Sequence, residues 1–432
     1  MNFAFYTLGC KVNQYETAAM ERMLIAAGYT PTSSDAMPDI FIINSCTVTA
    51  ESDRKTRQTV RKYRNLLPHA AIVLTGCMPQ AFPDDAASLD AADIVLGNNS
   101  NNRLIEALDS FFTTGKRTVI IDSHKKGEQF DTPPIERIEE RTRAYLKIQD
   151  GCNRFCSYCI IPTARGRERS KPLSDIAAEV KSIAAMGHRE IVLVGINLSA
   201  YGNDIGASLC DAVDAVCACD GIERVRLGSL EPDIFTDEMM KRLKAQPKFC
   251  PQFHFSLQSG CDATLKRMNR HYDAEFYRSL IKRVRENFTD AAITTDIMVG
   301  FAGESDAEFN SSLEFVKEIG FARAHVFAYS KREGTVAAKA DGQVSNAVKH
   351  ERSQKMIAAV SESENDFLLS QVGKTYPVLF EAKKGEFNEG YTPNYTYVKV
   401  KSDLDLCGRI VNVRLSESHG NYCTGTIEDK LP

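Results

Sequence analysis

Short apolar runs alternate with longer amphipathic segments in the first 122 residues of the chain. The apolar runs are FAFYTLGC, DIFIINSC, AIVLTGC, DIVLGN and TVIID, and segments of helical period such as NQYETAAMERMLIAAG lie between them. This alternation is typical of βαβ units, whose strands form a parallel sheet. The pattern therefore predicts an open parallel α/β domain over residues 1–122.

A second alternation of apolar runs and helical segments begins at residue 143. Its runs are AYLKIQDG, EIVLVGIN, RVRLGSLEP, FHFSLQSG, AAITTDIMVGF and AHVFAYS. These six βα units are fewer than a closed barrel of eight units requires, so we expect a partial, open barrel over residues 143–370. The polar, aperiodic residues 123–142 contain Pro-Pro, which predicts a linker between the two domains.

The end of the chain has a third pattern. Residues 346–371 have a charged helical pattern, and residues 371–432 change to short strand-like runs separated by Gly and Asn, the profile of a small β-barrel. The predicted fold class is therefore α/β, with an open parallel α/β domain, a partial (βα)6 barrel and a small C-terminal β-barrel. Charges nearly balance in the last domain, so a nucleic-acid contact there would use an aromatic face. The candidate aromatics are Tyr391, Tyr395 and Tyr397, and the alternative is that they simply build the barrel.

The composition fits a globular protein of several domains. The 432 residues are 43% hydrophobic and 25% charged, and they include thirteen cysteines. The first residues lack the basic and apolar segments of a signal peptide, and no run of about 18 apolar residues occurs, so we expect no membrane span. Cysteines in such a chain imply a reducing compartment, the cytoplasm, where clustered cysteines more often bind metal or catalyse than form disulfides.

The net charge of −4 argues against a protein covered in positive charge, but two basic stretches stand out. RKTRQTVRKYR at residues 54–64 has helical spacing, and ARGRERSK at residues 164–171 follows a group of cysteines. The alternative is solvated surface. Their nearness to cysteines favours contact with a polyanion. The residues expected to make it are Arg54, Lys55, Arg57, Arg61, Lys62, Arg64, Arg165, Arg167 and Arg169.

Three cysteines lie on one loop after the first strand of the second domain. CNRFCSYC contains Cys152, Cys156 and Cys159, which we call the loop cysteines. Thiolates at this spacing suit an iron–sulfur cluster or zinc, and no fourth Cys or His lies within the loop to close a zinc site. A 4Fe–4S cluster on three cysteines leaves one iron open to a small molecule. The alternative is three unrelated buried thiols.

CNRFCSYC resembles the signature of radical S-adenosylmethionine (SAM) enzymes, whose open iron binds the amino and carboxylate groups of SAM. The resemblance implies that one electron from the cluster splits SAM into a 5′-deoxyadenosyl radical, which abstracts hydrogen from unreactive carbon. It also places Tyr158 beside the adenine. Other strand ends should line the SAM site, unless they serve turns or helix caps. The candidates are Gly195, Asn197, Ser229, Glu231, Gln258, Ser259, Asp296 and Gly300.

Three more cysteines each follow a predicted strand of the first domain. Cys10 ends YTLGC, Cys46 ends IINSC and Cys77 ends VLTGC, and we call them the strand-end cysteines. The carboxyl ends of parallel strands share one edge of a sheet, so these thiols can converge on one cluster. The alternative is three structural thiols. The remaining cysteines are expected to be packing residues, namely Cys210, Cys217, Cys219, Cys250, Cys261, Cys407 and Cys423.

LGCKVNQYE, NSCTVT and TGCMPQ, followed by the radical SAM motif and a terminal β-domain, resemble the methylthiotransferase family over essentially the whole chain. The resemblance implies a second 4Fe–4S cluster on Cys10, Cys46 and Cys77, whose open iron holds a sulfur species, and a terminal RNA-binding TRAM domain. One departure is GFAGE, where the family usually has Gly-Phe-Pro-Gly-Glu and this chain has Ala302.

GCKVN and EGYTPNYTYV most resemble the subgroup that acts on N6-threonylcarbamoyladenosine, the modified base 3′ of the anticodon in tRNA. The implied reaction methylates the cluster-held sulfur with one SAM, and uses a second SAM to generate the radical that takes hydrogen from C2 of the adenine. Implied partners are a tRNA anticodon stem-loop and a reducing electron donor, with the chain acting as a monomer. The alternatives are isopentenyladenosine in tRNA, a ribosomal protein, or a non-catalytic iron–sulfur RNA-binding or electron-transfer protein.

Overall fold

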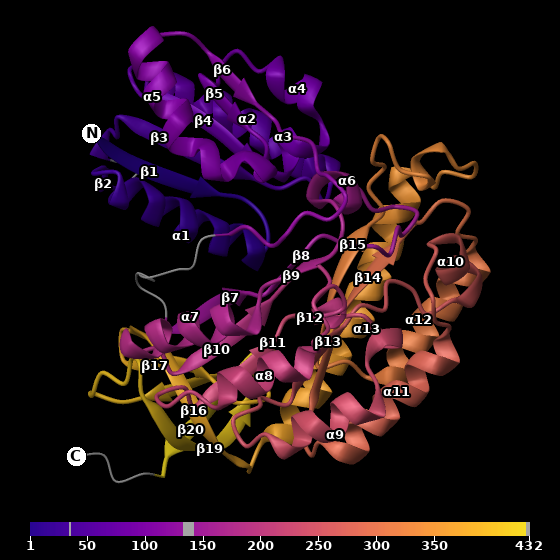
Figure 1. Ribbon diagram of the computed structural model, residues 1–432. Coiled ribbons are helices and arrows are strands. Elements are labelled where there is room, and N and C mark those ends of the chain that lie inside the picture. Colours follow the sequence, from indigo (N-terminus) through magenta and orange to yellow (C-terminus); the bar gives the residue numbers. More distant parts are fainter. Residues whose placement is uncertain (34–35, 133–141, 429–432) are drawn as a thin grey trace.

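The computed structural model describes residues 1–33, 36–132 and 142–428. The chain forms an N-terminal parallel sheet with helices, a central partial barrel and a closed C-terminal barrel, which confirms the predicted fold class (Figure 1). Residues 133–141 of the predicted linker, and residues 429–432 of the last domain, lie outside the described residues.

The N-terminal sheet has six parallel strands in the order β2-β1-β3-β4-β5-β6. Five of them are the predicted apolar runs, whereas β2 is too short for a hydrophobic pattern to reveal. The strands are β1 (Asn2–Thr7), β2 (Thr30–Pro31), β3 (Ile40–Ser45), β4 (Ala71–Gly76), β5 (Ile94–Leu96) and β6 (Thr118–Ile120). Strands β3 and β4 are buried along their whole lengths, since helices cover both faces of the sheet.

Alternate residues of each N-terminal strand face opposite helical layers. Ile40 and Ile42 pack with Leu24 and Leu108, whereas Phe41 packs with Val60 on the other face. The helices are α1 (Lys11–Ala26), α2 (Ala50–Leu66), α3 (Cys77–Ala81), α4 (Pro83–Ala87), the 3-10 helix η2 (Asn98–Arg103) and α5 (Leu104–Thr114).

The central domain is an open barrel made of two parallel sheets, β11-β10-β7 and β12-β13-β14-β15. The predicted run RVRLGSLEP is divided between β11 and β12 at Gly228, whose N–H donates to the Leu193 carbonyl at 2.8 Å. The strands are β7 (Arg143–Lys147), β10 (Glu190–Val194), β11 (Arg224–Leu227), β12 (Ser229–Leu230), β13 (Gln252–Phe255), β14 (Ala292–Val299) and β15 (Arg323–Ala328). A short antiparallel pair, β8 (Gln149–Asp150) and β9 (Arg169–Ser170), lies beside the mouth of the barrel.

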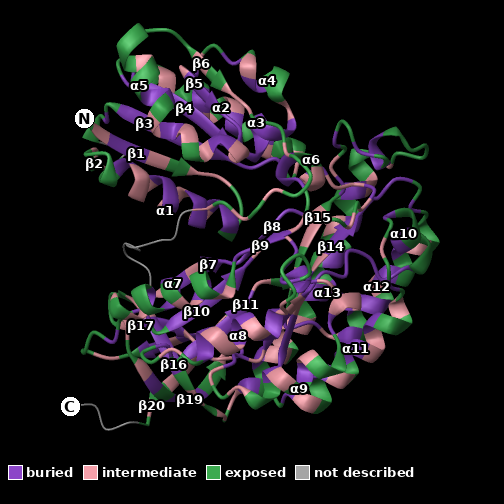
Figure 2. Cartoon of the chain, in the orientation of Figure 1, coloured by how far each residue is buried: buried purple, intermediate pink, exposed green. Residues whose placement is uncertain are grey.

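Helices cover the outer side of the barrel, and the main hydrophobic core lies between them and the strands. Ala144, Leu146 and Ile293 belong to this core. Because side chains alternate along a strand, the residues next to them, such as Tyr145, face the inside of the barrel. The helices are α6 (Ile161–Arg165), α7 (Leu173–Ala185), α8 (Leu209–Cys217), α9 (Asp237–Ala245), α10 (Asp262–Arg267), α11 (Ala274–Asn287), α12 (Asp306–Ile319) and α13 (Asn346–Gln371). Figure 2 shows the buried strands enclosed by helices with exposed outer faces.

The C-terminal domain is a closed barrel with the order β16-β17-β18-β20-β19. Its strands are β16 (Thr375–Lys384), β17 (Phe387–Tyr391), β18 (Tyr397–Lys401), β19 (Ile410–Ser418) and β20 (Cys423–Ile427). It docks on the amino-terminal ends of the central strands, where Arg143 pairs with Glu381 at 2.5 Å and Arg224 donates to the Tyr391 carbonyl at 3.0 Å.

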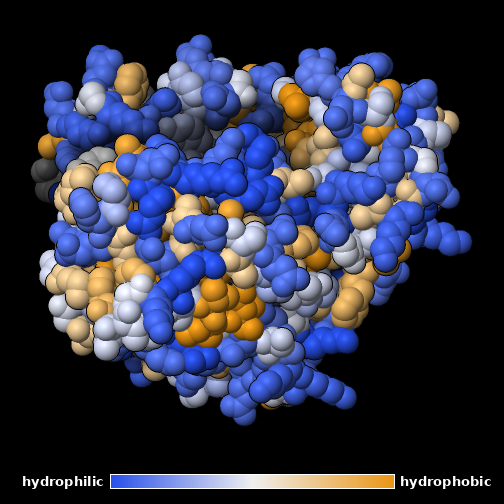
Figure 3. All heavy atoms as spheres, turned by 90° about the horizontal axis from the view of Figure 1, so that it is seen from above, coloured by the Kyte–Doolittle hydropathy of each residue, from blue (hydrophilic) through white to orange (hydrophobic). Residues whose placement is uncertain are grey.

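Among the helices that the structure describes, none is both long and apolar enough to cross a bilayer. The surface seen from above is largely hydrophilic, and hydrophobic residues are confined to separate patches (Figure 3).

Candidate functional site

The strand-end cysteines follow three strands that are neighbours in the sheet. Cys10 lies just beyond β1, and Cys46 and Cys77 directly follow β3 and β4. The turn before Cys10 passes close to Cys46, since a Cβ added at Gly9 would lie 3.0 Å from the Cys46 Cβ atom. Gly9 also has a φ of +118°, a conformation that favours glycine. The topology therefore brings these cysteines to one edge of the sheet.

Polar side chains connect the strand-end cysteines. The Cys10 thiol donates to Asn13 Oδ1 at 3.4 Å, and Asn13 Nδ2 donates to the Ser45 carbonyl at 2.9 Å. Arg165 joins the same group from the central domain, because its Nε donates to Cys77 Sγ at 3.2 Å and its Nη2 to Asn13 Oδ1 at 3.3 Å. The side chains of Cys10 and Cys77 thus meet a shared buried network rather than pointing apart.

Arg165 is held in place by a buried carboxylate. Its guanidinium is 1% exposed and pairs with both oxygens of Glu16 on α1, with Nη2 to Oε2 at 2.9 Å. Lys147 Nζ lies 2.7 Å from Glu16 Oε1 and 2.7 Å from Asp150 Oδ2. Burial raises the pKa of Glu16, but Arg165 and Lys147 outweigh it, so the pKa lies below its usual value and the carboxylate stays charged.

The loop cysteines lie between β8 and α6. Cys152 Sγ accepts a hydrogen bond from the Arg154 N–H at 3.4 Å, and Cys156 Sγ accepts one from Arg270 Nη1 at 3.1 Å. The Cys159 N–H donates to the Cys156 carbonyl at 3.0 Å, which folds the loop back on itself. All three are partly exposed, unlike the buried Cys46 and Cys77. The loop therefore offers three thiols to an incoming group.

Burial disfavours the free thiolate form at three of these six cysteines. Burial raises the pKa of Cys77, Cys152 and Cys159 to about 12, so without a cation these thiols stay protonated at neutral pH. Within the described part of the chain, no group of three His, Cys, Asp or Glu residues closes on a single metal ion. Three thiolates on separate irons of one 4Fe–4S cluster do not need that closeness, so the arrangement of the cysteines is compatible with such a cluster.

The two cysteine groups lie on either side of a domain interface. Cys77 begins α3 and packs with Ile160 and Ala164, which follow Cys159 in the central domain. Asn98 Nδ2 donates to the Ala164 carbonyl at 2.7 Å and lies 3.9 Å from Cys77 Sγ. Helices α3 and α6 lie side by side in Figure 1, so the edge of the N-terminal sheet covers the mouth of the barrel.

Lys11, next to Cys10, points into the barrel. Its Nζ lies 5.8 Å from the centre of the Tyr145 ring on the inner face of β7. The neighbouring Val12 packs with Val192 and Val194 of β10. Lys11 is solvent-exposed, but desolvation of its ammonium by nearby protein atoms, with repulsion from Arg143 and Arg226, lowers its pKa to about 8. The start of α1 therefore lies between the sheet edge and the inner face of the barrel, a region that we call the chamber.

Three of the residues predicted to bind SAM lie around the loop cysteines. Tyr158 lies between Cys156 and Cys159, with its ring centre 6.3 Å from that of Phe301. Glu231 pairs with Arg270, the side chain that donates to Cys156. Asn197 Nδ2 donates to Glu168 Oε1 at 3.1 Å, and the same oxygen accepts from the Asn153 N–H at 3.2 Å. These contacts place the three predicted residues beside one loop.

Of the four other predicted residues, Ser229 begins β12, Asp296 lies within β14, and Gln258 and Ser259 follow β13. Ser229 is exposed and is paired in register with His254, on the inner side of the barrel. Gln258 has a φ of +68°, and its buried Oε1 has no hydrogen-bond partner among the described residues. Ser259 is fully buried and accepts from the Cys261 N–H at 3.2 Å, which stabilises the turn. Asp296 Oδ2 lies 3.3 Å from His254 Nε2.

The two predicted glycines leave no room for a side chain. A Cβ at Gly195 would lie 2.9 Å from Gln149 Cβ, and one at Gly300 would lie 2.4 Å from Lys349 Cγ. Gly300 also has a φ of +69°. Close packing and backbone conformation therefore account for both glycines.

The predicted basic helix is α2, and most of its basic side chains are accessible. Lys55, Arg61 and Lys62 are exposed and Arg57 is partly exposed. Arg54 is exposed and pairs with a glutamate of its own helix. Arg64 instead anchors the end of the helix, because its side chain donates to the carbonyls of residues 70 and 91 at 3.1 and 3.2 Å.

Helix α2 begins beside the mouth of the barrel. The Ala50 N–H donates to Ser330 Oγ at 3.0 Å, and Arg332 pairs with Asp53 at 2.6 Å. Both barrel residues follow β15, at the same end of the barrel as the loop cysteines. The basic helix therefore extends away from the chamber opening.

The second predicted basic stretch is largely buried, so the prediction of polyanion contact is wrong for Arg165 and Arg169. Arg165 is 1% exposed within the network described above, and Arg169 is 7% exposed and pairs with Asp150 at 3.1 Å. Carboxylates far away in sequence bind both guanidiniums, which a local charge count cannot reveal. Arg167 is exposed and lies 4.6 Å from the centre of the Phe155 ring.

The C-terminal tyrosines partly serve the docking of the last barrel. The Tyr391 and Tyr395 rings stack at 4.5 Å, and Arg143 lies 4.9 and 5.0 Å from their centres. Tyr397 stacks on Tyr391 at 5.1 Å and lies further from the interface.

The expected packing role of the other cysteines holds for most of them, but Cys407 is exposed.

The roles of several residues at the site could not be predicted from the sequence. Arg270, Glu168 and Glu16 are single charged residues in helices and turns, and their contacts with the cysteine groups join segments far apart in the chain. Arg165 and Glu168 lay in a basic stretch that the sequence singled out for another role, and Glu16 ends the motif LGCKVNQYE without a role of its own.

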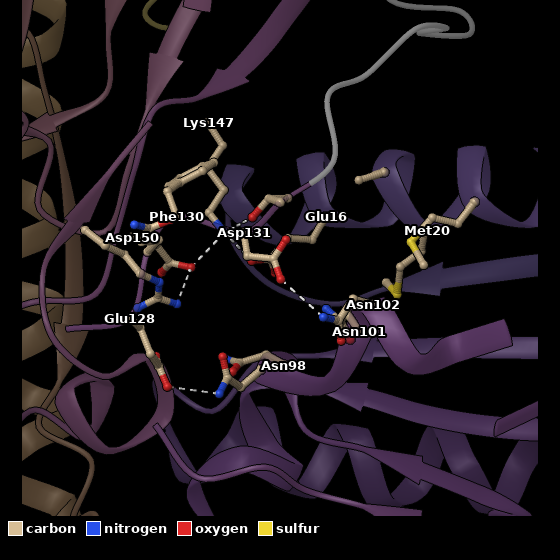
Figure 4. A pocket seen from close by; sticks show the side chains of 16 residues that line it. Glu16, Met20, Asn98, Asn101, Asn102, Glu128, Phe130, Asp131, Lys147 and Asp150 are labelled. Atoms are coloured by element: carbon tan, nitrogen blue, oxygen red, sulfur yellow. Dashed lines mark hydrogen bonds and ion pairs between the residues drawn. The ribbon is translucent and has the colours of Figure 1, made fainter. Parts of the chain in front are cut away.

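A polar cavity of about 480 Å³ lies between α1, η2, linker residues 128–132 and the barrel (Figure 4). Asn99 Nδ2 donates to Glu128 at 3.3 Å, and Asn102 Nδ2 donates to Asp131 at 3.2 Å. Lys147 closes the far side through Glu16 and Asp150. Carboxylate–amide contacts thus hold this part of the linker against the N-terminal domain.

Comparisons with known proteins match each part of this architecture. The Radical SAM superfamily matches residues 146–316, the Uncharacterized protein family UPF0004 matches residues 2–97, and the TRAM domain matches residues 369–427. The chain is similar to the radical SAM methyltransferase TsrM from Kitasatospora setae, with a TM-score of 0.57 and 12% identity over 78% of this chain and 74% of that one. That similarity is one of fold.

Relatives of known name align along nearly the whole chain. "Threonylcarbamoyladenosine tRNA methylthiotransferase MtaB" of Thermotoga maritima is 37% identical over 99% of this chain and 98% of its own. The Bacillus subtilis protein of the same name is 34% identical over 99% and 97%. A "tRNA-2-methylthio-N(6)-dimethylallyladenosine synthase" of Caldicellulosiruptor saccharolyticus is 34% identical over 98% and 91%. The chain therefore belongs to the radical SAM tRNA methylthiotransferase family, enzymes that use SAM and an iron–sulfur cluster.

Proposed function

We propose that the enzyme adds a methylthio group to C2 of N6-threonylcarbamoyladenosine beside the anticodon of tRNA. The observation that carries this proposal is the meeting of two cysteine groups at one chamber, with Arg165 of the central domain bonded to Cys77 of the N-terminal domain. One group for radical generation and one for sulfur delivery must reach the same substrate carbon, and this geometry supports that arrangement.

We propose that each cysteine group holds one 4Fe–4S cluster with an open iron. The ligands would be Cys152, Cys156 and Cys159 for the SAM cluster, and Cys10, Cys46 and Cys77 for the auxiliary cluster. When bound, these groups supply the electron that splits SAM and the sulfur that is transferred. The protein fixes the two sites relative to each other and keeps water from the radical.

The residues around the loop cysteines suit the recognition of SAM. Asn197, Glu231 and Gln258 present polar groups near the loop, and Tyr158 offers an aromatic edge for the adenine. Arg270 donates to Cys156 Sγ, so its positive charge stabilises the thiolate form of that ligand. Gly195 and Gly300 contribute through close backbone packing.

We propose that tRNA phosphates contact α2 and Arg167, which lie beside the chamber opening. Lys55, Arg61 and Lys62 are free of carboxylate partners among the described residues, so they are available to phosphate oxygens. The target base is in the single-stranded anticodon loop, where unstacking costs little.

We further propose that the enzyme acts in the cytoplasm as a monomer with a low-potential electron donor. Its proposed domains are residues 1–122, 143–370 and 371–432.

Nucleoside mass spectrometry of tRNA from a deletion strain tests the substrate. Loss of the methylthio form of threonylcarbamoyladenosine alone supports the proposal, and an unchanged profile refutes it. Loss of the methylthio-dimethylallyl nucleoside would instead place the enzyme with the Caldicellulosiruptor saccharolyticus relative. The purified enzyme with SAM and dithionite addresses the non-catalytic alternative, which predicts no formation of 5′-deoxyadenosine.

A further inference from the structure

The inner face of the barrel carries imidazoles and cations on neighbouring strands. His254 on β13, Asp296 on β14 and His325 on β15 alternate with core residues and therefore face inward. Asp296 is paired in register with His325, and the rings of His254 and His325 are 6.4 Å apart. Strands β13, β14 and β15 lie side by side in Figure 1. Arg323, two residues before His325, shares this face and is exposed.

Two cations of this chamber have no counter-ion in contact. The side chains of Lys11 and Arg323 make neither an ion pair nor a hydrogen bond with any residue in the described ranges. Both nevertheless lie near His325. Burial lowers the pKa of His325, Asp296 opposes this effect, and the charges of Arg323 and Lys11 lower it further. Burial raises the pKa of Glu364 on α13, and the charge of Arg323 partly offsets this rise without a direct contact between the two side chains. The chamber thus keeps positive charge available to a ligand.

Three arginines at the amino-terminal ends of the barrel strands have carboxylate partners. Arg226 Nε lies 3.0 Å from Glu190 Oε1, and Arg224 lies 3.5 Å from the other oxygen of the same carboxylate. Arg143 pairs with Glu381. These pairs form the floor of the barrel, where the C-terminal domain docks. Arg323 begins β15 and therefore lies at this same end of the barrel, whereas Lys11 enters from the side of the strand-end cysteines.

We infer that Lys11, Arg323 and His325 form a subsite for a carboxylate on the N6 substituent of the substrate adenine. This inference rests on the proposed function and adds the residues that distinguish its substrate. A threonylcarbamoyl group ends in a carboxylate, which forms charge-assisted hydrogen bonds with guanidinium and ammonium groups. A dimethylallyl group has no charge and would leave both cations without a partner. Lys11 follows Cys10, so the carboxylate would lie on the side of the chamber nearest the strand-end cysteines.

The test compares two anticodon stem-loop RNAs that differ only in the N6 group of the target adenine, threonylcarbamoyl or dimethylallyl. The reconstituted enzyme and its Arg323→Met and Lys11→Met variants are assayed for methylthio transfer and for equilibrium binding of each RNA. Removing one charge-assisted contact should raise the Kd and KM for the threonylcarbamoyl RNA roughly 10- to 100-fold. The values for the dimethylallyl RNA should stay unchanged or improve. Lys317→Met, on the outer helix α12, is the matched control and should change neither.

The outcomes separate the subsite from the proposed function. If the unaltered enzyme modifies the threonylcarbamoyl RNA and both variants bind it equally well, the subsite is wrong and the function stands. If the variants weaken both RNAs equally, the cations contact the RNA backbone, which also overturns the subsite. A rise only in the Kd for SAM would assign the cations to the cofactor instead and refute the inference. Activity of the unaltered enzyme only on the dimethylallyl RNA would refute the proposed function itself.

Discussion

Replacing Arg165 by Met should weaken the contact between the N-terminal domain and the barrel. The change removes a guanidinium that is 1% exposed and that bonds Glu16, Asn13 and Cys77. Breaking one side of a buried ion pair costs roughly 3–5 kcal/mol, because the remaining charge loses its partner. Lys147 Nζ still lies 2.7 Å from Glu16 Oε1, so the buried carboxylate keeps one of its two cationic partners. We therefore expect a loss of about 3 kcal/mol in the free energy of unfolding.

Urea unfolding of the reduced apoprotein under anaerobic conditions measures this loss. The chain contains no Trp, so far-ultraviolet circular dichroism is the suitable signal. Arg165→Lys keeps the charge but not the fork that bonds both oxygens of Glu16, and it should lose roughly half as much. Arg54→Met is the matched control, since the exposed Arg54–Glu51 pair is screened by water and should contribute little to stability.

A double-mutant cycle with Glu16→Gln separates the ion pair from general damage. If the pair acts as described, the double variant loses less than the sum of the single losses, with a coupling energy above about 1 kcal/mol. Additive losses, or an Arg165→Met protein that unfolds like the unaltered one, would refute the reasoning. Either result would mean that this network does not hold the two domains together.

Three further predictions address the clusters, the RNA and the last domain. Cys77→Ser should roughly halve the iron content after anaerobic reconstitution, whereas Cys423→Ser in the C-terminal core should leave it unchanged; equal effects would contradict two separate clusters. Lys55→Glu with Lys62→Glu should reduce the slope of log affinity for tRNA against log salt by about one for each lost phosphate contact, and an unchanged slope would remove α2 from the interface. Glu190→Gln, which leaves Arg226 without its carboxylate, should lower stability by about 3 kcal/mol in thermal or urea unfolding at neutral pH. Burial raises the pKa of Glu190 but Arg226 keeps it below its usual 4.5, so this difference should persist above pH 4.5 and vanish as the pH falls below the lowered pKa.

The positions of the six cysteines in the fold could be predicted from the sequence because each follows a strand. Apolar runs such as IVLTG can only be buried as strands between helices, and parallel strands end at a common edge. Cys46 and Cys77 therefore had to lie near one another once β3 and β4 were neighbours. The loop spacing of Cys152, Cys156 and Cys159 is likewise a local property of the chain.

What the sequence could not determine is which charges are buried. Arg165 and Arg167 lie two positions apart in one basic stretch, yet Arg165 is enclosed by Glu16 of another domain and Arg167 is exposed. Lys11 and Arg323 come from opposite parts of the chain and acquire their shared surroundings only when α1 covers the barrel. A periodic pattern predicts only which residues of the same helix or strand share a face. The partner of a charge is fixed by the packing of separate domains, so only the tertiary structure decided the electrostatics of the chamber.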